Sequence, residues 1–415
     1  MNQQVPGITR RGVLQGAVAA VCLTPRRAAS QEVTSYDVLV RGGQVIDPAA
    51  GTSASLDVAI RGGRVVRMSN AIPPSEARAV IDATGCIVTP GLVDMHVHVY
   101  DGVAPISIPP DANCIAKGVT TALDGGSAGA HTFPGFERFV AATSETRIYA
   151  LLNISVAGQS TFSEDNPHGE LLDLNLVNTK VAVATIERHR DRILGVKVRL
   201  TRNIAGENDL EVLGRACAAA RETQVPVMAH IGGAHSPLKQ ILAMLSPGDV
   251  VTHAFRAGEG GILDLRGIVL PEVREAIGRG IRLDVGHGAN GFSFETAERA
   301  LEQGVLPDVI SSDLHAYNYR GPVFDLVTTM SKFLHLGLTI EQVVDRVTRA
   351  PASIFRFPAG VGSLAPGSVA DVSVLRLEES SAIMVDSHAV QRPAGRQLRA
   401  VATLKAGELY GAPAA

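Results

Sequence analysis

Hydrophobic and polar positions alternate in a repeating way through the middle of the chain. Short apolar runs of strand length are separated by longer segments with the 3.6-residue periodicity of amphipathic helices. The expected helices include residues 209–222, 271–279 and 294–303. The expected strands lie at residues 91–97, 120–123, 148–154, 194–200, 225–230, 249–253, 281–285 and 308–312. This alternation predicts an α/β architecture built on parallel strands.

The number of strand–helix units narrows the choice of fold. Eight units over about 270 residues match the size of a (β/α)8 barrel of the TIM type. A doubly wound open sheet gives the same local pattern, so periodicity alone does not separate the two folds. Polar residues do separate them, because they gather at the carboxyl ends of the expected strands, where barrels form active sites.

The two ends of the chain have a different pattern, with short strand-like runs between glycine turns. The runs at 36–40 and 57–60 are each followed by Arg-Gly-Gly, which is typical of hairpins. Similar turn-and-strand segments lie at 362–364, 367–374 and 401–404. We therefore expect one small β-sandwich formed by residues 31–88 and 358–415, with the barrel inserted between them at residues 89–357.

Residues 1–30 have the pattern of a targeting signal. Arg10 and Arg11 precede a short apolar run at 13–25, and residues 28–30 offer a small-residue cleavage site. The segment resembles a twin-arginine export signal, which implies a periplasmic or secreted protein. Val13 stands where that pattern prefers Phe, so a basic tail on a cytoplasmic protein is the alternative.

Composition excludes several classes of partner. Hydrophobic residues make up 46% of the chain and charged residues 19%, which is ordinary for a globular protein with a sizeable core. The formal net charge is −3 and no basic run is interleaved with aromatics, so we expect no nucleic-acid partner. No stable membrane span is expected. The absence of close cysteine spacing argues against a disulfide framework or a zinc ribbon at Cys22, Cys86, Cys114 and Cys217.

Six ionisable residues fall within the expected strands or at their ends. Residues two apart in a strand share a face, so the first two can bind one ion together. Four imidazoles and a carboxylate suit Zn²⁺, with Mn²⁺ or Fe²⁺ as alternatives. The six are His96, His98, Lys197, His230, His253 and Asp313.

Each of these residues alone has an ordinary explanation, since a histidine at a strand end is more often structural than a ligand. Lys197 is different, because an unpaired ammonium in an apolar strand is costly to bury. It requires a partner, a shifted pKa or a chemical modification. The occurrence of all six at corresponding positions favours a metal site over a set of structural residues.

Two motifs carry a family resemblance. VTPGLVDMHVH at residues 88–98 closely resembles the first-strand signature of the amidohydrolase superfamily, and PGSVAD at 366–371 resembles its late motif. The resemblance extends from residue 36 to the end of the chain. Within the superfamily, residues 195–200, 284–294 and 312–315 resemble the deacetylase-like subgroup that is related to dihydroorotases.

The resemblance implies a centre with two divalent ions, expected to be Zn²⁺. Lys197 would be an N6-carboxylysine that bridges both ions, and a carbamate between two cations explains a lysine in this position. The remaining ligands would be His96, His98 and Asp313 for the more buried ion, and His230 and His253 for the other.

The implied reaction is hydrolysis of an amide or ester bond in a small acylated substrate. A hydroxide bridging the two ions would attack the carbonyl, because coordination lowers the pKa of water. Asp313 would take the proton and deliver it to the leaving group.

Several other polar residues are candidate substrate contacts. Arg199 shares the inward face of Lys197 and could pair with a substrate carboxylate, the alternative being a structural ion pair at the barrel mouth. His287 and Asn290, in the glycine-rich loop 286–291, and His315 are further candidates.

Tyr100 bears on the choice between two kinds of hydrolase. The resemblance implies that a dihydroorotase would have Arg two residues after the second His of the motif, and this chain has Tyr100 there. The departure favours hydrolysis of N-acetyl amino acids or O-acetyl hydroxy acids, and a cyclic-amide hydrolase acting on another ring stays open.

Two hypotheses come from another class, a catalytically inactive relative and a metal-binding or storage protein. The complete set of ligands and the candidate acid/base argue against both. Barrels of this kind often self-associate, so a homo-oligomer also stays open.

Overall fold

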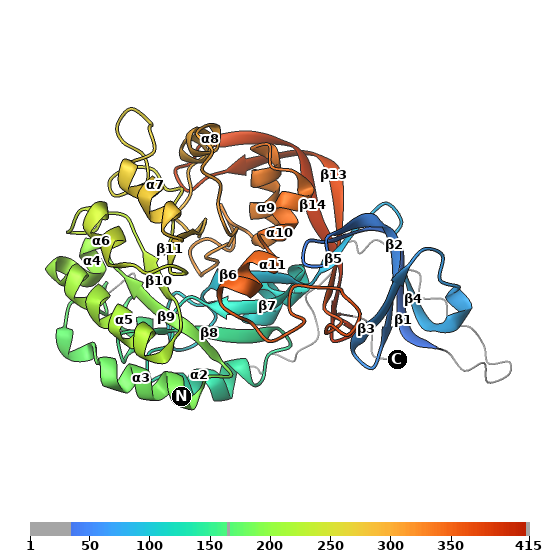
Figure 1. The fold of residues 1–415 in the computed structure, drawn as a ribbon, viewed down its shortest axis with the longest axis horizontal. Coiled ribbons are helices and arrows are strands. Elements are labelled where there is room, and N and C mark those ends of the chain that lie inside the picture. The colour runs from blue at the N-terminus through green and yellow to red at the C-terminus, as the bar shows by residue number, and fades with distance from the viewer. Residues whose placement is uncertain (1–34, 164–166, 412–415) are drawn as a thin grey trace, which may run out of the picture.

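The computed structural model describes residues 35–163 and 167–411. The signal segment expected at residues 1–30 lies outside the described residues. The described chain forms two sheets, a curled parallel sheet and a mostly antiparallel sheet with strands from both chain ends (Figure 1). The predicted fold class, a barrel with a terminal β-domain, is confirmed.

The parallel sheet forms the barrel, and its seven strands pair in sequence order. They are β6 (Leu92–Val97), β7 (Val119–Asp124), β8 (Arg147–Asn153), β9 (Ile193–Arg199), β10 (Val227–His230), β11 (Val250–Thr252) and β12 (Arg282–Leu283). The segment 308–314 takes the eighth position. It closes the circle through two isolated parallel bridges, from Val309 to Asp284 and from Leu314 to Val97.

Helices connect the strands, since parallel neighbours require a crossover. The helices expected at 209–222, 271–279 and 294–303 correspond to α5 (Asp209–Thr223), α7 (Pro271–Gly278) and α8 (Phe294–Glu302). No helix in the described part of the chain is both long and apolar enough to cross a membrane. The α-helices are α1 (Pro110–Asn113), α2 (Phe133–Phe136), α3 (Thr179–Arg188), α4 (Arg202–Ala205), α5 (Asp209–Thr223), α6 (Leu238–Met244), α7 (Pro271–Gly278), α8 (Phe294–Glu302), α9 (Leu326–His335), α10 (Ile340–Asp345) and α11 (Arg349–Ile354).

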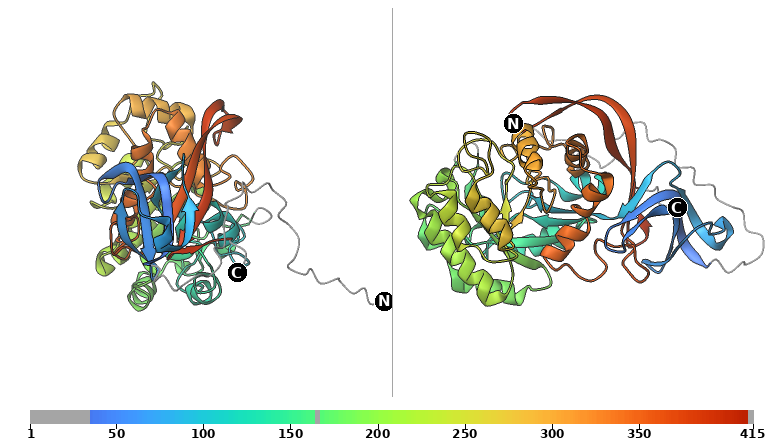
Figure 2. Two further views of the ribbon diagram at one scale, coloured as in Figure 1. Left: turned by 90° about the vertical axis from the view of Figure 1, so that its right-hand side faces the viewer. Right: turned by 45° about the horizontal axis from the view of Figure 1, so that its top comes forward.

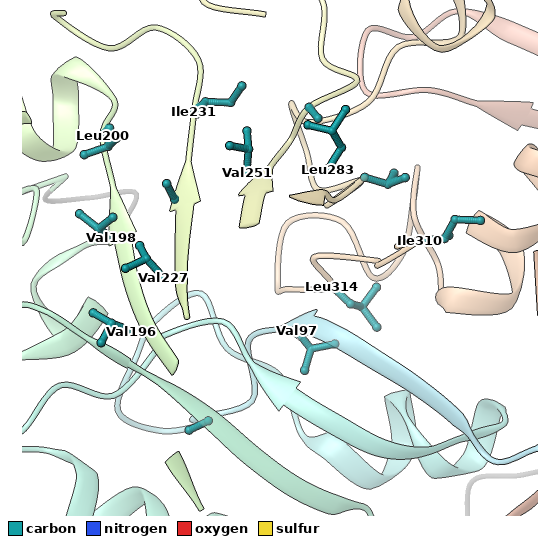
Figure 3. Close-up of a cluster of buried hydrophobic side chains, with 14 of the residues drawn as sticks. Val97, Val196, Val198, Leu200, Val227, Ile231, Val251, Leu283, Ile310 and Leu314 are labelled. Carbon is teal, nitrogen blue, oxygen red and sulfur yellow. The ribbon is translucent and has the colours of Figure 1, made fainter. Parts of the chain in front are cut away.

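Strand alternation divides the barrel residues between two environments. Val196, Val198 and Leu200 belong to the large apolar cluster that includes residues of the surrounding helices, and Figure 3 shows them beside Val227 of β10 and Val251 of β11. The residues between them, such as Lys197, therefore face the barrel interior.

A second apolar cluster lies beneath the polar residues. It contains Leu151, Met228 and Val250 from the barrel strands and Phe355 from the end of α11. Met228 precedes His230 by two residues on β10, so both side chains face the interior. This cluster, the apolar floor of the barrel, packs below the polar residues at the carboxyl ends of the strands.

The antiparallel sheet joins the two ends of the chain. Its strands are β1 (Tyr36–Asp47), β2 (Thr52–Arg61), β3 (Arg64–Ser69), β4 (Ala77–Asp82), β5 (Ile87–Pro90), β13 (Val372–Val385), β14 (Gln391–Lys405) and β15 (Glu408–Leu409). β5 pairs with β1 on one side and with β13 on the other. The sheet has its own apolar core, which includes Val45, Val88 and Val374, and Figure 2 shows it in front of the barrel.

The hairpin of β13 and β14 is longer than the sequence pattern predicted. The expected strands at 367–374 and 401–404 cover only its base, and the rest arches over the barrel beside α9 (Figure 1). At its tip, Asp386 Oδ2 accepts a hydrogen bond from Phe294 N at 2.9 Å. Ser387 N donates to Phe292 O at 3.1 Å. The far end of the chain therefore reaches the barrel loop that follows β12.

Asp371 connects the terminal sheet to the barrel, and its removal tests that connection. Its carboxylate forms an ion pair with Arg147 at the start of β8 and accepts from Ala406 N at 2.9 Å. Asp371→Ala leaves a mostly buried guanidinium unpaired, so we expect the free energy of unfolding in urea to fall by about 2–3 kcal/mol. The matched control is Glu295→Ala, which breaks an exposed pair with Arg299 and should leave it unchanged. Equal effects of both variants would contradict this assignment.

Candidate metal centre

The predicted polar residues converge at the carboxyl end of the barrel. Ligand atoms of His96, His98 and Asp313 lie within 4.8 Å of one another, and all three residues are buried. Asp313 Oδ1 is 3.3 Å from His96 Nε2 and 3.1 Å from His98 Nε2. Two imidazole nitrogens and a carboxylate oxygen in such an arrangement can hold one divalent ion.

Lys197 lies beside this cluster and is completely buried. Its Nζ is 2.6 Å from His96 Nε2 and 3.4 Å from Met228 Sδ. Burial lowers its pKa to about 8, although Asp313 and Asp284 act in the opposite direction. Within the described residues no carboxylate forms an ion pair with it. A buried amine without a counter-ion is costly as an ammonium, so the position of Lys197 is compatible with conversion of the amine to an anionic group between two cations.

His230 and His253 form a pair on the other side of Asp313. His230 Nδ1 is 3.1 Å from His253 Nε2, and His253 Nε2 is 4.0 Å from Asp313 Oδ2. His253 Nδ1 donates to the carbonyl of Gly286 at 2.6 Å, so its Nε2 carries a lone pair. The donor set therefore suits a second ion, with Asp313 between the two groups of ligands.

A second layer of polar residues orients the imidazoles. His96 Nδ1 lies 3.0 Å from Thr252 Oγ1, and that hydroxyl donates to Asp284 Oδ2 at 2.7 Å. His98 Nδ1 lies 2.9 Å from Ser127 Oγ. Hydrogen bonds of this kind fix the ring orientation and the tautomer of a ligand histidine.

Asp94 and Asp284 are buried acids beside the candidate centre, and the sequence pattern did not single them out. Burial raises the pKa of Asp94 to about 7 and that of Asp284 to about 6, against the hydrogen bonds that lower both values. Asp94 Oδ1 accepts from Ser312 N at 3.1 Å, which ties β6 to the segment that carries Asp313. Asp94 could have been identified from the sequence, because it lies two residues before His96 on the same face of the strand.

The imidazoles of the site are held in the form that binds metal. Burial is the largest cause of the shift in each case, and it lowers the pKa of His98 to about 3 and that of His253 to about 4. Burial also lowers the pKa of His96 and His230 well below the ordinary value of 6.5. All four rings are therefore neutral near pH 7, and neutral imidazole is the ligand form.

Two of the candidate ligands have unfavourable backbone conformations. His253 has φ of 64° and Asp313 has φ of 47°, in the left-handed region that residues with a Cβ rarely adopt. Each such residue costs on the order of 1 kcal/mol or more, so the surroundings must maintain it. Asp313 N donates to His96 O at 2.7 Å, and Asn318 Nδ2 donates to Asp313 O at 2.8 Å.

A cavity of about 610 Å³ opens over the site, a volume suited to a small molecule. His96 lies deeper than the cavity wall. The predicted residues that line it are His98, Lys197, Arg199, His230, His253, Asn290, Asp313 and His315.

Arg199 already has a counter-ion. Its Nε and Nη2 donate to the two carboxylate oxygens of Glu170 at 2.7 and 2.6 Å, and Glu170 is fully buried. The structural ion pair, one of the two alternatives for Arg199, is thus the one observed. Glu170 lies in a loop without hydrophobic periodicity, so no sequence pattern predicted it as the partner of Arg199.

His287 is not placed to contact a substrate as predicted. Its side chain is fully buried away from the cavity wall, and Lys332 Nζ lies 2.7 Å from its Nε2. The turn at Gly286–Gly288 directs it toward α9 and the tip of the β13–β14 hairpin, where Ser387 Oγ donates to His287 O at 3.0 Å. His287 therefore stabilises loop 286–291 on the side that faces away from the cavity.

The remaining candidate substrate contacts differ in whether their side chains reach the cavity. Asn290 is exposed at the cavity rim. His315 Nδ1 accepts from Tyr317 N at 3.2 Å, so its Nε2 carries the hydrogen and can donate into the cavity. Tyr100 is buried outside the cavity wall, and its hydroxyl donates to Thr132 O at 2.8 Å.

Comparison with known proteins agrees with this geometry. The family model described as Amidohydrolase family matches residues 87–393. A deacetylase of Enterococcus faecalis is 32% identical over 378 residues, which cover 90% of this chain and 99% of that protein. A deacetylase of Agrobacterium fabrum is 37% identical over 308 residues, or 74% of this chain and 75% of its own length.

Solved structures give the same result for the whole fold. A crystal structure of an adenine deaminase has a TM-score of 0.84 at 32% identity and covers 90% of this chain and 99% of its own. A crystal structure of a dihydroorotase has a TM-score of 0.81 at 31% identity, with coverage of 90% and 98%. The similarity therefore extends over both sheets.

Gly288 offers a test of the geometry around Asp313. It has φ of +50°, and a Cβ there would lie 2.3 Å from Asp313 Oδ2. Gly288→Ala should displace the carboxylate and weaken zinc binding by at least about tenfold, measured by calorimetry on chelator-treated protein. Gly304→Ala is the matched control, because it also has a positive φ but meets no described atom within 4 Å. Equal zinc affinities in both variants would show that Asp313 is not a ligand.

The buried histidines predict how acid affects the metal-free protein. The folded state lowers the pKa of His96, His98, His230, His253, His287 and His315 below 6.5. Below that pH the unfolded chain takes up protons that the folded chain does not, so stability falls as the pH decreases toward the folded pKa values. Asp94 and Asp284, with raised pKa values, offset part of this loss. The urea midpoint of the metal-free protein should be lower at about pH 5.5 than at about pH 7.5, and an equal or higher midpoint would contradict the neutral state of these rings.

Proposed function

Because this chain belongs to the amidohydrolase family and is a hydrolytic enzyme, we propose that it is a binuclear metal-dependent deacylase. Its substrate is a small acylated acid, either an N-acetyl amino acid or an O-acetyl hydroxy acid. The observation that carries the proposal is the position of Lys197. Its fully buried Nζ contacts His96 Nε2 and forms no ion pair with a described carboxylate.

The proposal assigns each ligand to one of two ions, expected to be Zn²⁺. Two bound divalent ions supply an activated water and polarise the scissile carbonyl. Lys197, as a carbamate, would supply an anionic ligand group to both ions. The other ligands are His96, His98 and Asp313 for the inner ion, and His230 and His253 for the outer ion.

Asp313 is the residue that moves the proton. It lines the cavity, and its two oxygens face different groups, with Oδ1 toward His98 and Oδ2 toward His253. A carboxylate in this position can accept the proton of the attacking water and donate it to the leaving nitrogen or oxygen. His315 is placed to orient the substrate through its Nε2 hydrogen.

A cyclic-amide hydrolase is the second candidate, because a dihydroorotase structure shares the whole fold. Tyr100 supports the deacylase instead. It occupies the position where the family resemblance implies a carboxylate-binding Arg in dihydroorotases, and its hydroxyl is bonded to Thr132 O outside the cavity. An inactive relative is disfavoured, because every implied ligand is present and oriented.

Metal content and turnover test the proposal together. Protein purified without chelators should contain about two zinc ions per chain and should hydrolyse acetylated acids. Lys197→Ala should retain at most one ion and lose at least about 100-fold in turnover, measured by elemental analysis and release of acetate. Lys197→Met is the control for the cavity that Ala creates, because it fills similar volume without an amine, and it should show the same losses.

Two results would overturn the proposal. A metal content of about one ion that is indifferent to Lys197 would exclude the bridged centre. Two ions without turnover of any acetylated acid would leave the centre in place but exclude the deacylase.

A further inference from the structure

Three arginines line the cavity over the metal centre, and two of them are neutralised. Arg199 pairs with Glu170 at 2.6 Å and Arg202 pairs with Glu259 at 2.8 Å. Arg256 differs from both, because in residues 35–163 and 167–411 no carboxylate lies within ion-pair distance of its guanidinium. Among the described residues, Arg256 is therefore the arginine of the cavity that has no ion-pair partner.

The guanidinium of Arg256 is held in place by backbone atoms. Its Nη1 donates to Glu259 O at 2.6 Å, and Gly233 N donates to the same carbonyl at 3.1 Å. It also packs directly on Gly232, where a Cβ would come within 2.2 Å of Nη1. A guanidinium has five N–H donors, so most of its hydrogen-bonding capacity is left for a ligand.

The surroundings of Arg256 favour an anionic ligand. The residue is half-buried, and its partial burial lowers the pKa of the guanidinium. Loss of hydration disfavours the charged guanidinium, and the charge of Glu259 only partly offsets this effect because that carboxylate pairs with Arg202. An anion that enters the cavity beside Arg256 would stabilise the charged form further. A carboxylate matches the planar fork of an arginine in two parallel hydrogen bonds.

The position of Arg256 links it to the reacting end of the substrate. It follows His253 by three residues, and both side chains line the same cavity, together with Asn290 and His315. A small molecule can therefore reach Arg256 and the metal centre at the same time.

We propose that Arg256 binds the free carboxylate of the substrate and restricts the enzyme to acylated acids that carry one negative charge. This inference rests on the proposed deacylase function. Arg199 was the predicted partner of a substrate carboxylate, but it forms an ion pair with Glu170. The inference assigns carboxylate binding to Arg256 instead.

The test compares each acid with its uncharged counterpart. Racemic N-acetylalanine and O-acetyllactic acid are each measured beside the corresponding primary amide, with 4-nitrophenyl acetate as a neutral ester. The wild-type enzyme should prefer the acids. Arg256→Gln should lower kcat/KM for the better acid by about 30- to 100-fold, mainly through KM, and should change kcat/KM for its amide by less than about threefold.

Two controls accompany the variant. Arg266→Gln removes the same charge from an exposed residue that pairs with Asp264 outside this cavity, and it should leave the preference for the acid unchanged. Zinc content and turnover of 4-nitrophenyl acetate show whether the centre of Arg256→Gln is intact.

The outcomes separate the two proposals. Equal losses on the acid and the amide, or no preference for the acid in the wild type, would overturn the role of Arg256 and leave the deacylase standing. Failure of the wild type to hydrolyse any of the acetylated compounds would overturn the deacylase and this inference with it.

Discussion

The burial of the Lys197 amine at the centre of the barrel is the constraint on which the site depends. The strand period turns this side chain inward, and the closed barrel removes it from water. Its contacts are an imidazole nitrogen and a thioether, and neither can neutralise an ammonium. The surrounding histidines are neutral, so the residues around this amine offer donor atoms of the kind that divalent cations bind. The second layer of hydroxyls and carboxylates then fixes the direction of each ligand.

Charge in the site is arranged by depth. Asp94 and Asp284 lie deepest and are held by hydrogen bonds from Ser312 and Thr252, which serve to orient ligands. The neutral imidazoles come next, above the apolar floor. Arg199, Arg202 and Arg256 line the cavity wall above them, where buried Glu170 neutralises Arg199. Among the described residues, the arginines of the cavity wall would attract a small anion, and Asp313 is the carboxylate that lines the same cavity.

Much of the site could be predicted from the sequence, because strand alternation fixes which side chains share a face. It placed His96 with His98 and put Lys197 inside the barrel. The directions of side chains in loops could not be predicted in this way. The side chain of His287 was expected in the cavity, but it is fully buried against Lys332. It lies in a turn with positive φ at Gly286 and Gly288, and a hydrophobic pattern does not predict such a turn. The upper part of the β13–β14 hairpin was missed because its polar, half-exposed residues alternate too weakly to indicate strands.

The β13–β14 hairpin also has a consequence for the order of synthesis. Loop 286–291 presents the Gly286 carbonyl to His253, and its other side is bonded to Ser387 near the end of the chain. β5, which precedes the first ligand strand, likewise pairs with β13. A chain leaves the ribosome from its N-terminus, so the ligands emerge well before the segment that supports them. The candidate metal centre can therefore reach its final geometry only after the β13–β14 hairpin has been synthesised and has packed against the loop.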